Sequence, residues 1–128
     1  LSFVRPYHRM LSGALAHDAD EVFQGAKGLG FLLEEDPEDS KRAFAELCFM
    51  GLEPFKGGVY SWGESDLAMR AMKSGKALAF KFRLRPPPRE VVFLDRKLGG
   101  VFIFLAVLKA RIDAGPMLRQ YLDAFNNT

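Results

Sequence analysis

The sequence predicts an all-α protein: a compact bundle of five to six helices around a central hydrophobic helix at about residues 88–110. Two observations lead to this fold class. Apolar residues recur at steps of three and four along most of the chain, which places them on one face of a helix. No run of alternating β-branched residues rivals these patterns. With 128 residues, the chain has the size of one domain.

Two helices are expected at the start of the chain. An apolar stripe with helical spacing follows Pro6, and proline is accepted in the first turn of a helix. Asp18, with Glu21 three residues later, has the pattern of a capping box and predicts the start of a second helix. Gly28 and Gly30 are expected to end that helix. This glycine pair also resembles part of a phosphate loop, but no strand precedes it and no Lys-Ser or Lys-Thr follows, so a helix end is favoured.

The middle of the chain predicts two more helices around one long connection. Asp36, followed by a proline and two acids, predicts the start of the third helix. Residues 53–63 are rich in glycine but carry three aromatic side chains, which we expect to pin this connection down. Ser61 and Glu64 predict the cap of the fourth helix. A last helix is expected from Gly115 onward.

The hydrophobic helix at about residues 88–110 is the segment on which the rest is expected to pack. Its longest uncharged run, Leu98 to Leu108, has eleven residues and is well short of the roughly 20 that a membrane-spanning helix needs. Because its apolar residues cover all sides, we predict a buried core helix. Gly99 and Gly100 each cost about 1 kcal/mol relative to alanine in a helix interior. We therefore expect a neighbouring helix to approach closely at these glycines.

Composition excludes several classes of protein. Hydrophobic residues make up 48% and charged residues 27%, and the formal net charge is +2. These values exclude a disordered chain and a strongly basic nucleic-acid-binding protein. A single cysteine, Cys48, excludes an internal disulfide and a cysteine-based zinc site. The start at Leu1 has no signal-peptide pattern and no initiator methionine, so we expect a piece of a longer intracellular protein, cytoplasmic or peripheral to a membrane.

No constellation of side chains predicts catalysis, a metal site or a cofactor site. His8 and His17 have no partner at metal-ligand spacing, and an isolated histidine near a helix end is more often a polar contact. Cys48 lies on the apolar stripe of the third helix, which favours a buried, unreactive thiol. We therefore assign no catalytic, metal-binding or cofactor-binding residue.

The charged residues around the hydrophobic helix are expected to be structural. On the helical projection Arg96 points to the side later occupied by Ile103 and Val107, so we expect it to be partly buried and paired with a carboxylate. The predicted structural residues are Pro88, Asp95, Arg96, Gly99 and Gly100. Four cations flank the prolines and favour a solvated basic edge, with peripheral membrane contact as the alternative: Lys81, Arg83, Arg85 and Arg89.

The order of these segments resembles the C-terminal region of the AarF/UbiB family of atypical kinases, over essentially the whole chain. The most specific part is a Pro-Pro-x5-Leu-Asp-Arg-x3-Gly string, formed here by Pro87, Pro88, Leu94, Asp95, Arg96 and Gly100. The resemblance implies the helical end of a large kinase lobe. It also implies a parent protein that uses ATP and Mg²⁺ and is linked to isoprenoid-quinone (ubiquinone) biosynthesis and lipid homeostasis.

The departures from that family limit what this chain is expected to do. Phosphoryl transfer needs a loop over the phosphates, a lysine that pairs with them, a catalytic-loop Asp and a magnesium-binding Asp. None of these motifs is present, so we expect a non-catalytic domain whose partner is the upstream kinase core. The alternative is a free-standing helical module that binds protein or lipid. A small metal- or cofactor-dependent enzyme has almost no support.

A separated lobe is expected to expose an apolar face and to self-associate, most simply as a two-fold dimer. The expected bare segments are Phe3 with Val4, residues 31–33, and the aromatic connection with Phe55, Tyr60 and Trp62.

Overall fold

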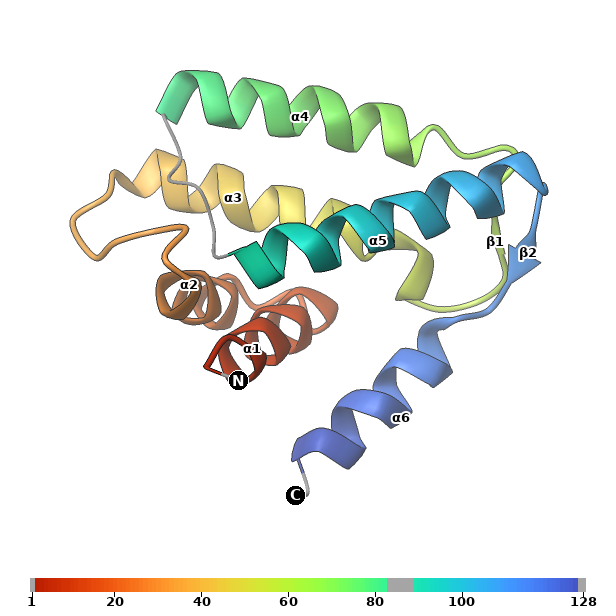
Figure 1. Ribbon diagram of the computed structural model, residues 1–128, viewed down its shortest axis with the longest axis horizontal. Helices are drawn as coiled ribbons and strands as arrows, with labels where there is room; N and C mark the ends of the chain where they lie inside the picture. Colours follow the sequence, from red (N-terminus) through yellow and green to blue (C-terminus); the bar gives the residue numbers. More distant parts are fainter. Residues whose placement is uncertain (1, 83–88, 127–128) are drawn as a thin grey trace.

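The computed structural model describes residues 2–82 and 89–126. This part of the chain contains six α-helices, one short 3-10 helix and one two-stranded sheet (Figure 1). In chain order the elements are α1 Val4–Leu15, α2 Ala19–Leu29, α3 Glu38–Gly51, η1 Glu53–Phe55, β1 Tyr60–Ser61, α4 Leu67–Phe82, α5 Arg89–Val107, β2 Arg111–Ile112 and α6 Gly115–Asn126. The predicted all-α class is confirmed, because each described strand has only two residues.

Helices α1 and α2 form a tightly packed hairpin. A Cβ atom on Gly25 would lie 2.6 Å from the backbone oxygen of Pro6 and from the backbone nitrogen of Met10, so the two backbones meet where only glycine fits. The Asp18 carboxylate accepts hydrogen bonds from two backbone N–H groups in the first turn of α2. Gly30 ends the helix in the left-handed conformation, with φ of 84°. The predicted start at Asp18 and end at Gly30 are confirmed, whereas Gly28, which was also expected to end the helix, lies inside it.

The starts of α3 and α4 differ from the predicted ones. The N-cap position of α3 is Pro37, one residue after the predicted Asp36. The Asp36 carboxylate accepts a hydrogen bond from the backbone N–H of Leu33, at 2.8 Å, and so closes the preceding turn. The first turn of α4 is capped by Ser65, whose Oγ lies 3.0 Å from the backbone nitrogen of Leu67. Ser61 instead belongs to β1. Several capping residues are present in each connection, and the path of the chain decides which of them is used.

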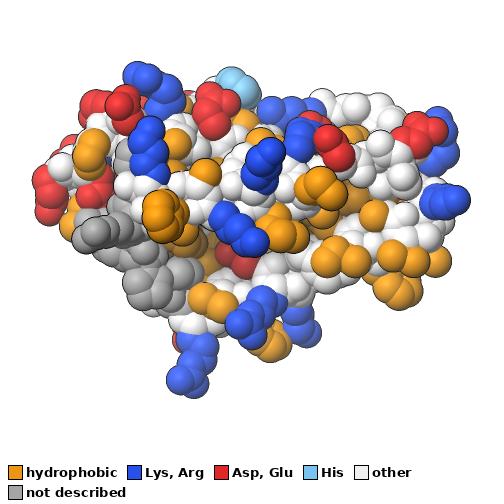
Figure 2. Space-filling view, turned by 90° about the horizontal axis from the view of Figure 1, so that it is seen from above, with side chains coloured by type: hydrophobic (Ala, Val, Ile, Leu, Met, Phe, Trp, Pro, Cys, Tyr) orange, Lys and Arg blue, Asp and Glu red, His pale blue; other side chains and the backbone are white. Residues whose placement is uncertain are grey.

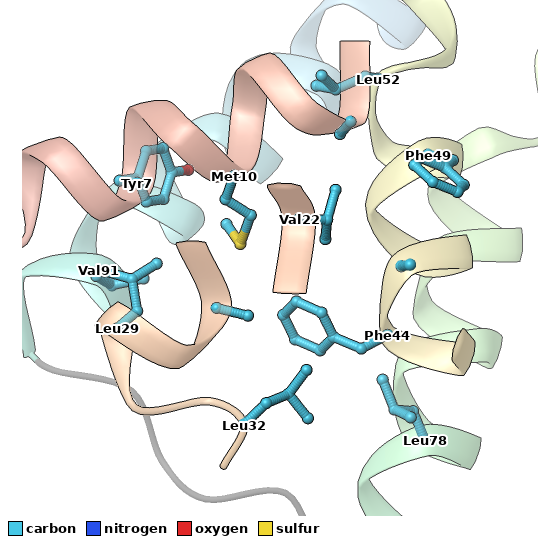
Figure 3. Packing of buried hydrophobic residues seen from close by; sticks show 13 residues of the cluster. Tyr7, Met10, Val22, Leu29, Leu32, Phe44, Phe49, Leu52, Leu78 and Val91 are labelled. Atoms are coloured by element: carbon cyan, nitrogen blue, oxygen red, sulfur yellow. The ribbon is translucent and has the colours of Figure 1, made fainter. Parts of the chain in front are cut away.

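The core lies between α1, α2 and α3 (Figure 3). Its best-buried large side chains include Val22 and Leu32, each 1% exposed or less. The more distant helices contribute little to it, since among the described side chains Leu78 of α4 and Val91 of α5 are their only members of this cluster. The full set is Tyr7, Met10, Ala14, Val22, Ala26, Leu29, Leu32, Phe44, Ala45, Phe49, Leu52, Leu78 and Val91.

Helix α5 exists as predicted, but the prediction that it is buried at the centre is wrong. Val91 is the only buried residue among those described in this helix. Phe93 is 61% exposed, Phe104 65% and Val107 73%. The reason is geometric: α1, α2 and α3 close a core of their own, and a helix lying against one side of that core buries only one stripe of its circumference.

A short antiparallel pairing joins the connection after α3 to the connection after α5. Tyr60 pairs with Ile112, and Ser61 pairs with Arg111. The backbone N–H of Trp62 donates to the carbonyl oxygen of Ala110 at 2.9 Å. Strands this short have no detectable alternation in sequence, which is why the sequence did not predict them.

Candidate functional site on helix α5

One stripe of α5 faces the bundle. Val91 is fully buried, Asp95 forms a hydrogen bond with α1, and Phe102 packs against aromatic side chains of the connection after α3. These three residues are separated by steps of four and seven, so they lie on one face of the helix. The opposite face of α5 has no such partners within the described chain, and this two-sidedness is the main feature of the site.

The inner contact centres on a pair from the first and fifth helices. The hydroxyl of Tyr7 donates to Oδ1 of Asp95 across 3.0 Å. Burial raises the pKa of Asp95, and the hydrogen bond from Tyr7 partly opposes that rise. Burial, followed by the nearby Asp95 charge, raises the pKa of the Tyr7 phenol. The predicted structural role of Asp95 therefore has a specific partner in α1.

Cys48 lies near this pair and is unreactive in character. Its side chain is half-buried, and burial, followed by the negative charge of Asp95, raises the pKa of the thiol to about 12. A thiol with so high a pKa is almost entirely protonated at neutral pH and is a poor nucleophile. The location and the pKa both support the interpretation of Cys48 as an inert thiol.

Aromatic side chains hold the far end of α5. The rings of Trp62 and Phe102 meet edge to face, with centroids 4.7 Å apart. Tyr60 packs on Trp62 at 5.2 Å, and Phe55 lies 6.2 Å from Phe102. Trp62 is only 3% exposed. The prediction that these aromatics pin the glycine-rich connection is confirmed, whereas the expectation that they form a bare surface is wrong.

The bare surface lies on α5 instead. We define its outer face by Phe93, Lys97, Gly100, Val101 and Phe104, together with Leu108, the residue directly after the helix; the four large apolar members are each more than half exposed. A groove of about 400 Å³ on this face is lined by Lys97, Gly100, Val101, Phe104 and Leu105. The other expected bare segments, Phe3 with Val4 and residues 31–33, are half-buried or buried.

The glycines of α5 and Arg96 do not have the predicted surroundings. A Cβ atom on Gly99 or Gly100 would meet nothing within 4 Å, so no helix of the described chain approaches them. Arg96 is exposed, and within residues 2–82 and 89–126 it has no ion pair. The predicted burial of Arg96 is wrong, because the outward side of α5 faces solvent. Pro88 lies outside the described residues.

Charge is unevenly distributed along the chain. Helices α4 and α5 together carry seven Lys or Arg residues and two acids, a balance of +5, while the whole chain carries only +2. Hydrophobic and basic side chains lie exposed next to one another in the view over α4 (Figure 2). The cations are Arg70, Lys73, Lys76, Lys81, Arg89, Arg96 and Lys97. This side of the molecule therefore combines apolar and positively charged surface.

A polar network that the sequence did not predict fixes the start of α4. Arg70 donates two hydrogen bonds to the carboxylate of Glu53, at 3.1 and 2.7 Å, and a third to Asp66 at 2.6 Å. The Tyr60 hydroxyl bonds to Glu53 and Ser65. The hydrogen bonds from Arg70 and Tyr60 outweigh burial and lower the pKa of Glu53. Seventeen residues separate Glu53 from Arg70, so no local pattern marks this pair.

His8 connects the two ends of the chain. It is 7% exposed, and its Nε2 lies 3.0 Å from the hydroxyl of Tyr121 in α6. The Phe125 ring packs edge to face on the imidazole at 3.8 Å between centroids. Burial lowers the pKa of His8. This contact joins α1 to α6.

Among the described residues no cluster of three or more His, Cys, Asp and Glu side chains could hold a metal ion. In the same residues no helix has the length and apolar character needed to cross a membrane.

No protein-family model matches the chain. Its curated relatives include "Atypical kinase COQ8B, mitochondrial" of Rattus norvegicus, 34% identical over 111 residues that are 86% of this chain and 21% of the relative. "Atypical kinase COQ8, mitochondrial" of Saccharomyces cerevisiae is 25% identical over 92% of this chain and 24% of its own length. "Probable serine/threonine-protein kinase abkA" of Dictyostelium discoideum is 24% identical over 96% of this chain and 23% of its own length.

The matches have a similar extent, and all three relatives are named as kinases. They cover most of this chain, while the chain spans only between a fifth and a quarter of each of these relatives. This is the extent expected from the resemblance to one region of a kinase. The chain is therefore a homologue of the AarF/UbiB (COQ8) family of atypical kinases, and its match is consistent with their C-terminal region.

Proposed function

We propose that this chain serves as a non-catalytic helical part of an AarF/UbiB-like atypical kinase and supports the catalytic lobe of that protein. The observation that carries the proposal is the two-sided character of α5. Its inner stripe is bound to α1 and to the aromatic connection, while its outer face presents large apolar side chains to solvent. Such a face is what a helix exposes when its neighbour lies in another part of the protein.

The residues of the chain support the non-catalytic part of the proposal. Kinase chemistry depends on positioning phosphates and Mg²⁺, and this requires a phosphate-covering loop, a lysine and two acidic or amide metal ligands. The sequence has no match to these motifs. In the proposed arrangement ATP and Mg²⁺ are bound by the rest of the kinase, and this chain holds the catalytic lobe in shape.

A chimera tests this function. The 128-residue chain replaces the matching stretch of the rat kinase, and binding of ATP and Mg²⁺ is followed by calorimetry and by the shift in melting temperature. We expect nucleotide binding by the chimera and none by the isolated chain. A control replaces the same stretch by an unrelated helical domain of similar length, which should abolish binding. Magnesium-dependent, saturable ATP binding by the isolated chain would overturn the non-catalytic assignment.

A second candidate function is a free-standing helical module that binds protein or lipid. It is favoured by the combination of exposed apolar and basic side chains on α4 and α5. Apolar side chains surrounded by Lys and Arg suit a surface of anionic lipid. Sedimentation of the isolated chain with anionic phospholipid vesicles, compared with zwitterionic ones, tests this candidate. Binding to the anionic vesicles alone, together with a chimera that fails to bind ATP, would favour it.

A further inference from the structure

We propose that the outer face of α5 docks against one helix of the catalytic lobe, and that Gly100 marks the point where the two helices cross. This inference rests on the proposed function and names the partner surface: a helix with an apolar stripe and acidic residues at its edge. It commits to the rest of the same kinase as the occupant, rather than to a second copy of the chain or to lipid.

The outer face of α5 has a groove at Gly100 where a second helix can approach. Gly100, Val101 and Phe104 are among the residues that line the groove, and a Cβ placed on Gly100 would meet no atom of another described segment within 4 Å. A glycine lets a second helix approach closely, where a larger side chain would hold it away. The same device is already used inside the chain, where Gly25 allows α2 to pack against α1. Gly25 has its neighbour in this structure, and Gly100 has the space for one.

The exposed apolar side chains of the outer face form a stripe on which a second helix can pack. Phe93, Val101, Phe104 and Leu108 are between 54% and 65% exposed. They follow one another at steps of eight, three and four, which is the spacing of a helix-docking stripe. These side chains leave water if an apolar stripe covers them. Burial of such a stripe is the main favourable term in helix packing.

The positive charge near the groove favours a covering helix with acidic residues. Lys97 lies at the groove, with its Nζ 5.0 Å from the centre of the Phe93 ring, and α4 and α5 contain seven Lys or Arg residues against two acids, although one of the seven, Arg70, is already paired with acids outside these helices. A covering helix with acidic residues at its edge is attracted to this surface. Two copies of the chain paired through α5 would bring two positive surfaces together, which opposes symmetric pairing here. Charge alone also fits anionic lipid, and the experiment below separates that case.

The kinases that match this chain are long enough to contain the helix that we expect to cover the outer face of α5. This chain spans 21% of the rat kinase and 24% of the yeast kinase, so most of each relative lies outside the matched stretch. Homologues therefore contain long segments that are able to cover α5 within one polypeptide. An intramolecular partner also needs less binding affinity than a separate protein, because the connecting chain raises its effective concentration.

Thiol labelling tests the inference. Val101→Cys places a reactive probe on the outer face, and Met117→Cys, at a site on α6 that is 60% exposed, is the matched control. The native Cys48 is half-buried with a pKa of about 12, so it reacts slowly with a maleimide. In the isolated chain both new thiols should react quickly. In the chimera with the rat kinase, Val101→Cys should react at least about tenfold more slowly, with Met117→Cys unchanged.

A charge-reversal variant tests the contribution of Lys97. In the chimera that carries Val101→Cys, Lys97→Glu should restore faster labelling, because it repels an acidic edge. Lys73→Glu makes the same charge change on α4, at an exposed site that does not line the groove, and should leave the labelling rate unchanged. Equal effects of the two variants would contradict a specific acidic partner at Lys97.

Each other outcome overturns the inference. Fast labelling of Val101→Cys in a chimera that binds ATP and Mg²⁺ would show that the face is open in a working kinase, while the proposed function stands. Protection in the isolated chain that grows with concentration would identify a second copy. Protection caused by vesicles of anionic phospholipid would identify lipid. If the chimera does not fold, cysteine at the aligned position of the intact rat kinase gives the same comparison, and fast labelling there would again overturn it.

Discussion

The hydroxyl of Tyr7 and the carboxylate of Asp95 are 88 residues apart in sequence and 3.0 Å apart in space. The two groups fasten the first helix of the chain to the fifth. Among the described residues, the other attachments of α5 include Val91, which is buried in the core, and Phe102, which packs on the aromatic connection. This hydrogen bond therefore fixes which side of α5 faces the bundle and which side remains open for a partner.

Removing the donor should destabilise the chain. Tyr7→Phe removes the hydrogen bond to the Asp95 carboxylate, and because Asp95 is still open to solvent we expect a loss of about 0.5 to 1.5 kcal/mol of unfolding free energy. Urea denaturation measures the loss. A double-mutant cycle with Asp95→Ala, which removes the acceptor, is the control, because the coupling energy isolates this pair from other effects of either change. A coupling near zero would mean that the hydrogen bond does not hold α5.

The pair also predicts a dependence on pH. Burial raises the pKa of Asp95 above its unfolded value of 3.8, so its negative charge disfavours the folded state at neutral pH. The folded state gains relative stability as pH falls through the raised pKa, and the gain is complete below 3.8. Asp95→Asn removes this charge, so we expect it to be more stable than the native chain at pH 7. Urea titrations should show that this difference vanishes in acid; a constant difference would contradict the assignment.

Two phenylalanines on α5 provide a matched comparison. Phe102→Ala removes the ring that packs on Trp62 and Phe55, and we expect a loss of about 2 kcal/mol, below the roughly 3 to 5 of a fully buried phenylalanine. Phe104→Ala changes a side chain that is 65% exposed and should cost no more than about 0.5 kcal/mol in the isolated chain. Thermal and urea unfolding measure both. Similar losses would mean that the two faces of α5 are not distinct.

Replacing glycine by alanine should stabilise the chain at one helical position and destabilise it at another. Gly100→Ala fills open space in a helix interior and should stabilise the isolated chain by about 0.5 to 1 kcal/mol. Gly25→Ala places a Cβ atom 2.6 Å from backbone atoms of Pro6 and Met10, and overpacking of this kind typically costs about 1 to 3 kcal/mol. The melting temperatures of the two variants decide the matter. Destabilisation by Gly100→Ala would reveal a contact at that site.

Arg96 is exposed and has no ion pair among residues 2–82 and 89–126. We therefore expect Arg96→Ala to change the unfolding free energy by no more than about 0.5 kcal/mol, as for other surface sites. A buried pair would instead cost about 3 to 5 kcal/mol. Chemical denaturation distinguishes the two values, and a loss in the higher range would place a carboxylate partner beside Arg96.

His8 should make the chain less stable in mild acid. Burial lowers its pKa below the unfolded value of 6.5, so the folded state favours the neutral ring. The stability is fully present above 6.5 and is lost as pH falls through the lowered pKa. Arg5, Arg9 and Glu21 line the adjoining groove, and Tyr121 faces the ring from α6.

The measurement is the unfolding free energy between about pH 7.5 and 5.5 in the native chain and in two variants. His8→Phe keeps an aromatic ring that cannot be protonated and should flatten this part of the pH profile. His17→Asn changes the other histidine, which is exposed and has a φ of 59° that asparagine tolerates. It should retain the slope of the native chain. If the unfolding free energy of His8→Phe depended on pH as steeply as that of the native chain, groups other than His8 would be responsible for the loss of stability in acid.

The sequence by itself determined the helical class, the family and the local helix signals. Asp18 and Gly30 act at the ends of α2 as predicted, because a cap needs only the few residues around it. The string from Pro87 to Gly100, with Asp95 and Arg96 inside it, pointed to the family of the kinases that the comparison found. These features depend on the order of neighbouring residues, and that order is what a sequence displays directly.

Only the tertiary structure decided which apolar surface is buried. A helix that is apolar on all sides, such as α5, gives no periodic signal for its inner face. In the structure the inner side of α5 is the one that carries Val91, Asp95 and Phe102. Tyr7 and Trp62, from distant parts of the chain, contact Asp95 and Phe102 on that side. The same choice left Arg96, Gly99 and Gly100 in solvent. Burial depends on which segments arrive from far away in sequence, and helical periodicity contains no information about them.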